Sequence, residues 1–354
     1  MGQKNKIRVL VVDDSAGIRE ILTSLLEQDT AIVVLKAVAD PYEAAGVIAE
    51  EVPDVITLDL EMPRMGGLIF LEKLMNQHPI PVVIVSSFTA ERRELGIRAL
   101  ALGAAEVVTK SGFSTPAGLE HFGMLLRNAV RAASMQNVNR HRFFYRKQNT
   151  KGPKADLFLS GPSADAAVKR IILIGASTGG TGLIAEMLKA LRTDLPPILI
   201  VQHMPGEFTK SYADRLNADC ALPVKEAGKN ERLRNGHVYV ANGFSHLIVK
   251  QVGEDFFCDL LEEKNDNLPR PSVDRLFHSV AVLHGLKVLA VLLTGMGVDG
   301  AVGMLELKER GAFCVAQDEK SCAVYGMPRE AVRLNAASLV GNPQQIIGCI
   351  NRFR

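Results

Sequence analysis

A serine in a glycine-rich turn is the first residue of this sequence that could do chemistry. The segment Gly175-Ala-Ser-Thr-Gly179 fits the pattern G-x-S-x-G, and it lies between an apolar run and a helical pattern. In a sharp strand-to-helix turn, small neighbours expose the serine hydroxyl, and free N–H groups at the helix start can stabilise an oxyanion. Ser177 is therefore a candidate nucleophile, with the ordinary alternative that it only caps a helix.

The same turn could instead bind phosphate, as glycine-rich loops before helices do in nucleotide-binding proteins. A P-loop needs a lysine after its last glycine, but Gly-Thr-Gly stands at residues 180–182. The dinucleotide pattern fails because Ser177 occupies the position of its second glycine. The next apolar run ends in Gln202-His203, without the acid that would hold a ribose hydroxyl. The nucleophile interpretation is favoured over the phosphate one.

A serine nucleophile needs a base, and His203 is the histidine best placed to serve. It ends the apolar run that directly follows the Ser177 unit, so both residues are expected at one sheet edge. Asp299, after the later run LAVLLTGMG, could accept the His203 N–H and stabilise its imidazolium. Each alone could be structural, as a satisfied imidazole or a helix N-cap. The order Ser…His…Asp differs from the Ser…Asp…His of α/β-hydrolases.

A second set of chemical residues ends the apolar runs of the first half. Asp13 and Asp14 end the first run, Asp59 the third, Ser86 the fourth and Lys110 the fifth. In a parallel sheet these ends share an edge, where three carboxylates repel one another unless a hard cation such as Mg²⁺ lies between them. The lysine and the serine could then bind a phosphoryl group transferred to a carboxylate. Alone, each acid could be an N-cap or a solvated strand end.

Both sets of residues need parallel strands to position them, and the alternation of the chain predicts such strands. Apolar runs alternate with helix-period segments from residue 7 onward. Helices are expected at about 15–28, 41–51, 66–77, 90–102 and 118–134. From residue 169 the alternation resumes, and the close runs HVYVAN, HLIVKQV and DFFCDLLE predict an antiparallel hairpin inserted in a parallel α/β sheet.

Length and composition divide the chain into two domains and a linker. With 354 residues it exceeds what one hydrophobic core usually supports. From Arg127 to Ala155 there are Lys and Arg residues but no Asp or Glu. We predict a first domain over residues 6–128, a linker over 129–168 and a second domain over 169–354. A basic arm that binds nucleic acid is the alternative for the linker, but no accompanying motif supports it.

The bulk composition predicts a cytoplasmic protein without direct membrane insertion. A net charge of +2 gives no global reason to expect nucleic acid or an anionic membrane as a partner. The chain opens without a signal region, and no run approaches the ~20 apolar residues that span a bilayer. The five cysteines form no CxxC pair, and neither HExxH nor clustered His and Cys indicates zinc.

Several segments in both halves resemble known signalling proteins. The first half carries VVDDS, DLEMPRMGG, VSS and VTK in the order found in response-regulator receiver domains. The second half carries IGASTGG, QHM, RPSVDRLF, LLTGMGVDGA and AQDEKSCAVYGMP. Together they resemble the chemotaxis-specific protein-glutamate methylesterase/glutaminase family, over nearly the whole chain except the linker. The resemblance implies a flavodoxin-like receiver joined by a linker to a doubly wound α/β hydrolase-type domain.

The resemblance also implies roles for the residues of the receiver. The pair Asp13–Asp14 would bind Mg²⁺ together with Asp59, which a chemotaxis histidine kinase would phosphorylate. Ser86 would be the switch hydroxyl and Lys110 the cation that faces the phosphate. Receivers usually have proline after this lysine, whereas Ser111 stands here, which puts the common cis peptide bond in doubt.

In the catalytic domain the resemblance implies Ser177 as nucleophile, His203 as general base and Asp299 as its orienting acid. The backbone of Met296 would donate to the oxyanion, and no cofactor is expected there. The implied substrates are methylated glutamates and selected glutamines in the cytoplasmic domains of chemoreceptors, and we expect a monomer. Two other classes stay open: a non-catalytic output domain, and a transcription factor, which would need a basic recognition helix.

Overall fold

The chain divides into two units, residues 1–151 and 152–354, in the computed structural model. The structure describes residues 6–62, 65–86, 95–96, 98–100, 102–110, 115–135, 167–262 and 269–354. Most of the predicted linker therefore lies outside the described residues. Among the helices of the described ranges, none has the length and apolarity that a membrane span requires.

The first unit contains a five-stranded parallel sheet, which confirms the predicted receiver-like fold. Its strands, in the spatial order β2-β1-β3-β4-β5, are β2 (Ile32–Val38), β1 (Ile7–Val12), β3 (Val55–Leu58), β4 (Val82–Ser86) and β5 (Glu106–Thr109). Strands β3 and β4 are buried along their whole length, as expected for Val- and Ile-rich strands covered on both faces. The strand order reverses between β1 and β3, which is where sheets of this kind bind ligands.

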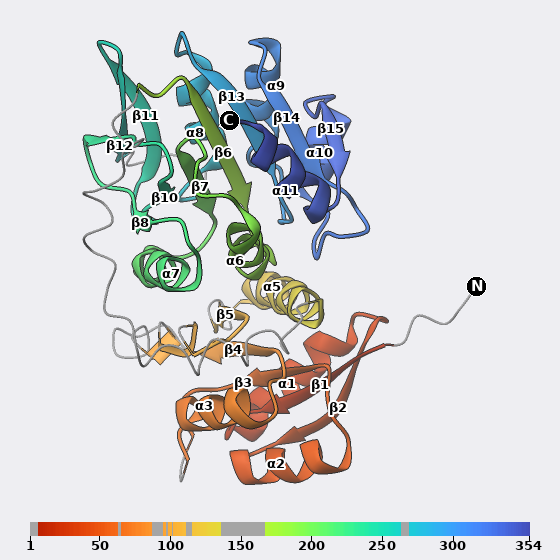
Figure 1. Ribbon diagram of the computed structural model, residues 1–354. Helices are drawn as coiled ribbons and strands as arrows, with labels where there is room; N and C mark the ends of the chain where they lie inside the picture. The colour runs from red at the N-terminus through yellow and green to blue at the C-terminus, as the bar shows by residue number, and fades with distance from the viewer. Residues whose placement is uncertain are drawn as a thin grey trace. The chain divides into compact units, whose positions relative to one another are not determined.

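Helices cover both faces of this sheet (Figure 1). They are α1 (Ala16–Glu27), α2 (Pro41–Glu50), α3 (Gly67–Gln77) and α5 (Pro116–Ser134). Of the helix expected at 90–102, residues 95–96 and 98–100 are helical and most others lie outside the described residues. Helix α5 continues six residues beyond the predicted domain boundary at 128, because Ala129, Val130 and Ala133 keep its apolar face in the core.

The second unit is built on a seven-stranded parallel sheet. In spatial order its strands are β15 (Leu339–Gly341), β14 (Phe313–Gln317), β13 (Lys287–Leu292), β6 (Arg170–Ala176), β7 (Ile198–Gln202), β10 (Val238–Val240) and β8 (Val224–Glu226). The chain leaves β6 toward β7 on one side, and β13 pairs with β6 on the other side. The carboxyl ends of these three strands thus meet at a switch point.

Helices on both faces make this sheet doubly wound, as predicted. One face is covered by α6 (Gly180–Ala190), α7 (Gly206–Asp219) and α11 (Pro343–Arg352), and the other by α8 (Val273–Ala281), α9 (Ala301–Glu309) and α10 (Met327–Arg333). The alternation of β6 explains this two-sided core. Ile172 and Ile174 point to the first face, and Ile171 and Leu173 point to the second.

The prediction for the three close runs needs a correction. Only the second and third form the hairpin, as β11 (His246–Val252) and β12 (Asp255–Leu261), and β9 (Glu231–Arg232) extends it into a separate antiparallel sheet. The first run is β10, a parallel strand of the main sheet between β7 and β8. Its three residues are all buried, which is typical of a strand covered on both faces rather than of a hairpin.

A substitution near the carboxyl end of β6 tests the packing at the switch point. An alanine Cβ at Gly175 would lie 2.4 Å from Cγ1 of the buried Val273. We expect Gly175→Ala to destabilise the protein by about 1–3 kcal/mol, because this core has no room for a methyl group. In denaturant unfolding, the control Gly348→Ala, in helix α11 with only ordinary contacts, should instead stabilise by about 0.5–1 kcal/mol. Equal effects of the two substitutions would contradict this account of the core.

Candidate active site

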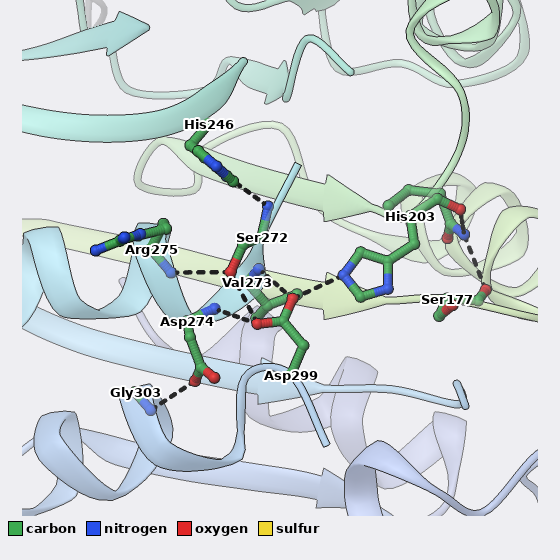
Figure 2. Close-up of polar contacts among 10 residues, drawn as sticks. Ser177, His203, His246, Ser272, Val273, Asp274, Arg275, Asp299 and Gly303 are labelled. Carbon is green, nitrogen blue, oxygen red and sulfur yellow. Dashed lines mark hydrogen bonds and ion pairs between the residues drawn. The ribbon is translucent and has the colours of Figure 1, made fainter. Parts of the chain in front are cut away.

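The strand ends of the second unit bring the three predicted triad residues together. Ser177 follows β6 and His203 follows β7, and the backbone N–H of His203 donates to the carbonyl of Ala176 at 2.9 Å. Asp299 lies in the loop between β13 and α9, and its Oδ2 is 2.7 Å from Nε2 of His203. Figure 2 shows the imidazole between Asp299 and Ser177. The convergence predicted from three separate strand ends is thus present in the structure.

Asp299 is almost fully buried and makes four hydrogen bonds. Besides His203, it accepts from the Ser272 hydroxyl at 2.8 Å and from the backbone N–H groups of Val273 at 2.7 Å and Asp274 at 3.0 Å. Burial alone raises the pKa of this carboxyl. The hydrogen bond and charge of His203 and the two backbone donors outweigh burial and hold the pKa below its ordinary value. Asp299 is therefore an ionised carboxylate that can orient an imidazole.

The turn that carries Ser177 is fixed by its main chain. The Ser177 N–H donates to the Thr294 carbonyl at 3.0 Å, and the Ser177 carbonyl accepts from the Gly180 N–H at 2.8 Å. Gly179 has a φ of 82°, in the left-handed region that favours glycine. The Gln202 side-chain amide donates to the carbonyls of both Ser177, at 2.8 Å, and His203, at 3.2 Å. The backbones of the candidate nucleophile and base are thereby tied to each other.

The Ser177 hydroxyl makes no hydrogen bond to His203 among the described residues. Hydrogen bonds of this kind are often long in the absence of substrate and tighten when it binds. The Nε2 atom of His203 is already bonded to Asp299, so Nδ1 is the ring nitrogen left for the serine. The arrangement can therefore pass a proton from serine to imidazole once a substrate aligns the two groups.

The segment that contains Met296 lies against the Ser177 turn. A Cβ at the preceding Gly295 would stand 2.7 Å from the Ser177 Cβ, so only glycine fits there. The Gly295 N–H donates to the Val324 carbonyl at 3.0 Å, and the Gly295 carbonyl accepts from the Met327 N–H at 2.9 Å. The predicted oxyanion donor is thus one residue from the closest approach to the candidate nucleophile.

Sequence reasoning missed the segment that holds Asp299. Residues 270–274 matched a family motif but had no assigned role. In the structure Ser272 caps α8, and the first turn of that helix supplies two of the N–H donors to Asp299. A serine followed by an amphipathic helix with an acid in its first turn indicates a cap, although no sequence pattern indicates what else the cap would hold.

The first unit gathers its own charged residues at the sheet edge. Lys110 Nζ lies 2.7 Å from Asp13 Oδ2 and 2.9 Å from Asp59 Oδ2. Asp13, Asp14 and Asp59 each offer a carboxylate oxygen, and these atoms lie within 4.8 Å of one another. Burial favours a neutral Lys110, but hydrogen bonds from its amine to both carboxylates raise its pKa. An all-oxygen set of this kind could hold a metal ion.

The remaining predicted residues of the first unit fall at the same edge or outside the described chain. Ser86 ends β4 and is buried, and its carbonyl accepts from the Lys110 N–H at 2.8 Å. The strand register pairs Ser86 with Thr109, the residue before the lysine. Ser111 lies outside the described residues, so the prediction about its peptide bond stays a prediction.

The pH dependence of stability tests the carboxylate pair at the start of α8. The Asp274 carboxylate accepts from the Gly303 N–H at 2.7 Å. Burial raises its pKa from 3.8 to about 6, and the charge of Asp299 adds to this. The folded protein thus holds this proton more tightly than the unfolded chain, so Asp274 makes folding less favourable as pH rises from 3.8 to about 6.

We therefore expect Asp274→Asn to become more stable relative to wild type over that pH window, and the difference to level off above it. The measurement is the free energy of unfolding of both proteins across this range. Asp299→Asn is the control with opposite sign, measured below this window. Because the pKa of Asp299 is lowered from 3.8, the stability that this carboxylate contributes is lost only as pH falls below 3.8. If the free energy of unfolding of wild type and of Asp274→Asn changed in parallel with pH, the raised pKa of Asp274 would be contradicted.

Comparisons with known proteins agree for both units. The family model described as CheB methylesterase matches residues 172–350, and the response regulator receiver domain model matches residues 9–116. A protein-glutamate methylesterase/protein-glutamine glutaminase from Burkholderia lata is 45% identical over 335 residues, covering 94% of this chain and 91% of the relative. A similarly named protein from Geobacter metallireducens is 42% identical, covering 95% of each chain.

A solved structure resembles the second unit. The crystal structure of the Thermotoga maritima CheB methylesterase catalytic domain is 37% identical in sequence, with a TM-score of 0.50. It covers 52% of this chain and 98% of that chain. The sequence identity to these relatives over nearly the full length and the matches to the two family models support the same assignment. The chain belongs to the CheB methylesterase family, in the form that carries a response regulator receiver domain.

Proposed function

We propose that this protein is a phosphorylation-regulated protein-glutamate methylesterase and protein-glutamine glutaminase of a chemotaxis or related chemosensory pathway. The observation that carries the proposal is the 2.7 Å bond between His203 and Asp299, beside the serine turn at the carboxyl edge of the sheet. The names of relatives that align over almost the whole chain support the same activity. The described geometry fits acyl transfer through a serine, which is a single chemistry for both reactions.

In the proposed mechanism, the Ser177 Oγ attacks the γ-carbonyl carbon of a methylated glutamate. The hydroxyl proton passes to Nδ1 of His203, while Asp299 stabilises the imidazolium through Nε2–H. The bond between the carbonyl carbon and the methoxy oxygen then breaks. His203 returns the proton to the methoxy oxygen, and methanol leaves. Water, deprotonated by His203, attacks the acyl-enzyme and releases the glutamate and Ser177.

The negative charge of the tetrahedral intermediate needs donors near the serine. The backbone N–H of Met296 and the N–H groups at the start of α6 are the groups we propose for this role. The main-chain bonds of Gly295 hold this segment in place before substrate arrives, so little reorganisation is needed. The same oxyanion forms from a glutamine side chain, and ammonia then leaves in place of methanol.

We propose that the receiver is phosphorylated on Asp59 by a chemotaxis histidine kinase. The carboxylate oxygens of the receiver fit Mg²⁺, and Asp13, Asp14 and Asp59 would hold the ion. The ion would neutralise charge on the phosphoryl group. Lys110 would remain paired with the phosphorylated side chain, and the Ser86 hydroxyl would hydrogen-bond to the phosphoryl oxygens. Phosphorylation would shift a population from a less active to a more active form of the enzyme.

The proposed substrates are the cytoplasmic domains of chemoreceptors, which places the protein in the cytoplasm. A carboxylate product and a small leaving group require no cofactor in the catalytic domain. We propose a monomer as the active form.

Replacing the nucleophile tests the chemistry. Ser177→Ala should lower methanol release from methylated receptor on the order of a thousandfold or more, because no other group can form the acyl-enzyme. The control Ser211→Ala, in the second turn of helix α7, should release methanol like wild type. Methanol release by Ser177→Ala at the wild-type rate would show that Ser177 is not the nucleophile, and the phosphate-binding interpretation of the glycine-rich turn would then return.

Replacing the phosphorylated carboxylate tests the regulation. Asp59→Asn should keep the basal rate of methanol release but lose its stimulation by a small phosphodonor with Mg²⁺, because an amide cannot accept the phosphoryl group. Asp54 lies just before β3, at the opposite end of that strand, and pairs with Arg8 at 3.0 Å. Asp54→Asn should therefore keep the stimulation. A full response of Asp59→Asn to phosphodonor would rule out this residue as the acceptor.

A further inference from the structure

A second buried histidine contacts the segment that holds Asp299. His246 is the first residue of β11 and is fully buried, and its Nδ1 accepts the backbone N–H of Ser272 at 3.1 Å. Figure 2 shows this imidazole on the side of Ser272 away from Asp299. The separate antiparallel sheet therefore contacts the N-cap of α8 through this histidine.

Three hydrogen bonds in series connect His246 to the imidazole of the catalytic site. The first joins His246 to the Ser272 N–H, and the second joins the Ser272 hydroxyl to Asp299 Oδ1 at 2.8 Å. The third joins Asp299 Oδ2 to His203 at 2.7 Å. Both His246 and Ser272 are fully buried, so water does not replace a lost bond without a change in packing.

The direction of the first bond sets the state of the His246 ring. Because Nδ1 accepts from an N–H group, it carries no proton, and the ring is neutral with its proton on Nε2. With a proton on Nδ1, the ring N–H would point at the Ser272 N–H, and no hydrogen bond would form. The bond therefore places the Ser272 backbone at a fixed point, from which its hydroxyl reaches Asp299.

We propose that His246 is a positioning residue of the methylesterase, which holds Ser272 and through it the orientation of Asp299 against His203. The inference rests on the proposed function. His246 touches neither substrate nor the reacting atoms. Its effect on catalysis comes from the placement of a buried carboxylate, where small displacements change the rate strongly.

The fold offers a matched control for this role. A second hydrogen bond joins the same strand to the same helix, from the Val249 N–H to the Ser279 hydroxyl at 3.0 Å. Ser279 lies about two turns further along α8 and has no bond to Asp299. Loss of this bond weakens the contact of β11 with α8 but leaves the route to the catalytic site intact.

The test compares substitutions at His246 by steady-state kinetics of the full-length protein on methylated receptor. Asn places an oxygen acceptor where Nδ1 lies, whereas Gln places its amide further out and Leu has no acceptor. His246→Leu and His246→Gln should lower kcat by about tenfold with KM near the wild-type value, and His246→Asn should recover most of it. Ser279→Ala should leave kcat within about twofold of wild type. The Asn and Gln pair decides the question if His246→Leu does not fold.

A double substitution separates positioning from a general loss of structure. In an Asp299→Ala background, His246→Gln should have no further effect on kcat, because the group that it positions is gone. The same tenfold loss in that background, or an equal loss in Ser279→Ala, would overturn the proposal. So would wild-type kcat in both His246→Leu and His246→Gln.

A readout independent of turnover keeps this test distinct from that of the proposed function. The proton shared by His203 and Asp299 should give a far-downfield proton NMR signal in wild type, His246→Asn and Ser279→Ala. The signal should broaden or disappear in His246→Gln. An unchanged signal in His246→Gln would overturn the positioning role even if the enzyme acted on a different substrate.

Discussion

The burial of one carboxylate, Asp299, is the constraint on which the catalytic unit depends. An ionised carboxylate inside a protein is stable only when its oxygens are paired. Here the start of α8 supplies a hydroxyl and two backbone N–H groups, and His203 supplies the remaining donor. The start of α8 also favours negative charge, because the aligned peptide dipoles of a helix place partial positive charge at its N-terminus. The packing of α8 against the sheet and the orientation of His203 are therefore two consequences of satisfying the same charge.

The two units follow one architectural rule with different chemistry. Each has a parallel sheet with a switch point, and each places its charged or nucleophilic residues on the carboxyl ends of neighbouring strands. In the first unit a lysine compensates two of three neighbouring carboxylates, whose oxygens could hold a metal ion. In the second unit an imidazole compensates one carboxylate, which leaves the other ring nitrogen for a serine. Because Asp13 in the first unit and Asp299 in the second are buried, each needs a positively charged or hydrogen-bonding partner.

Much of this could be predicted from the sequence because strand ends carry the chemistry. The apolar runs that precede Asp59 and Ser177 are continuous and buried, and each is followed by a helix-period segment. Their end points and their common edge therefore follow from the alternation of strands and helices. The place of β10 could not be predicted, since a three-residue apolar run has no period and its partners are distant in the chain. The roles of Ser272 and His246 were equally hidden. They depend on contacts between a helix cap and a strand of another sheet, which leave no local pattern.

The choice of ring nitrogen has a mechanical consequence. Because Nε2 of His203 binds Asp299, the proposed proton transfer from Ser177 uses Nδ1, the nitrogen nearer to the main chain. Ser177 and His203 directly follow Ala176 and Gln202, which are register partners on adjacent strands. The separation of the proposed nucleophile and base is then governed by the spacing of two hydrogen-bonded strands, about 4.8 Å, and not by the reach of long side chains. That spacing is among the least deformable lengths in a folded protein, so the alignment of the two groups is as stiff as the sheet itself.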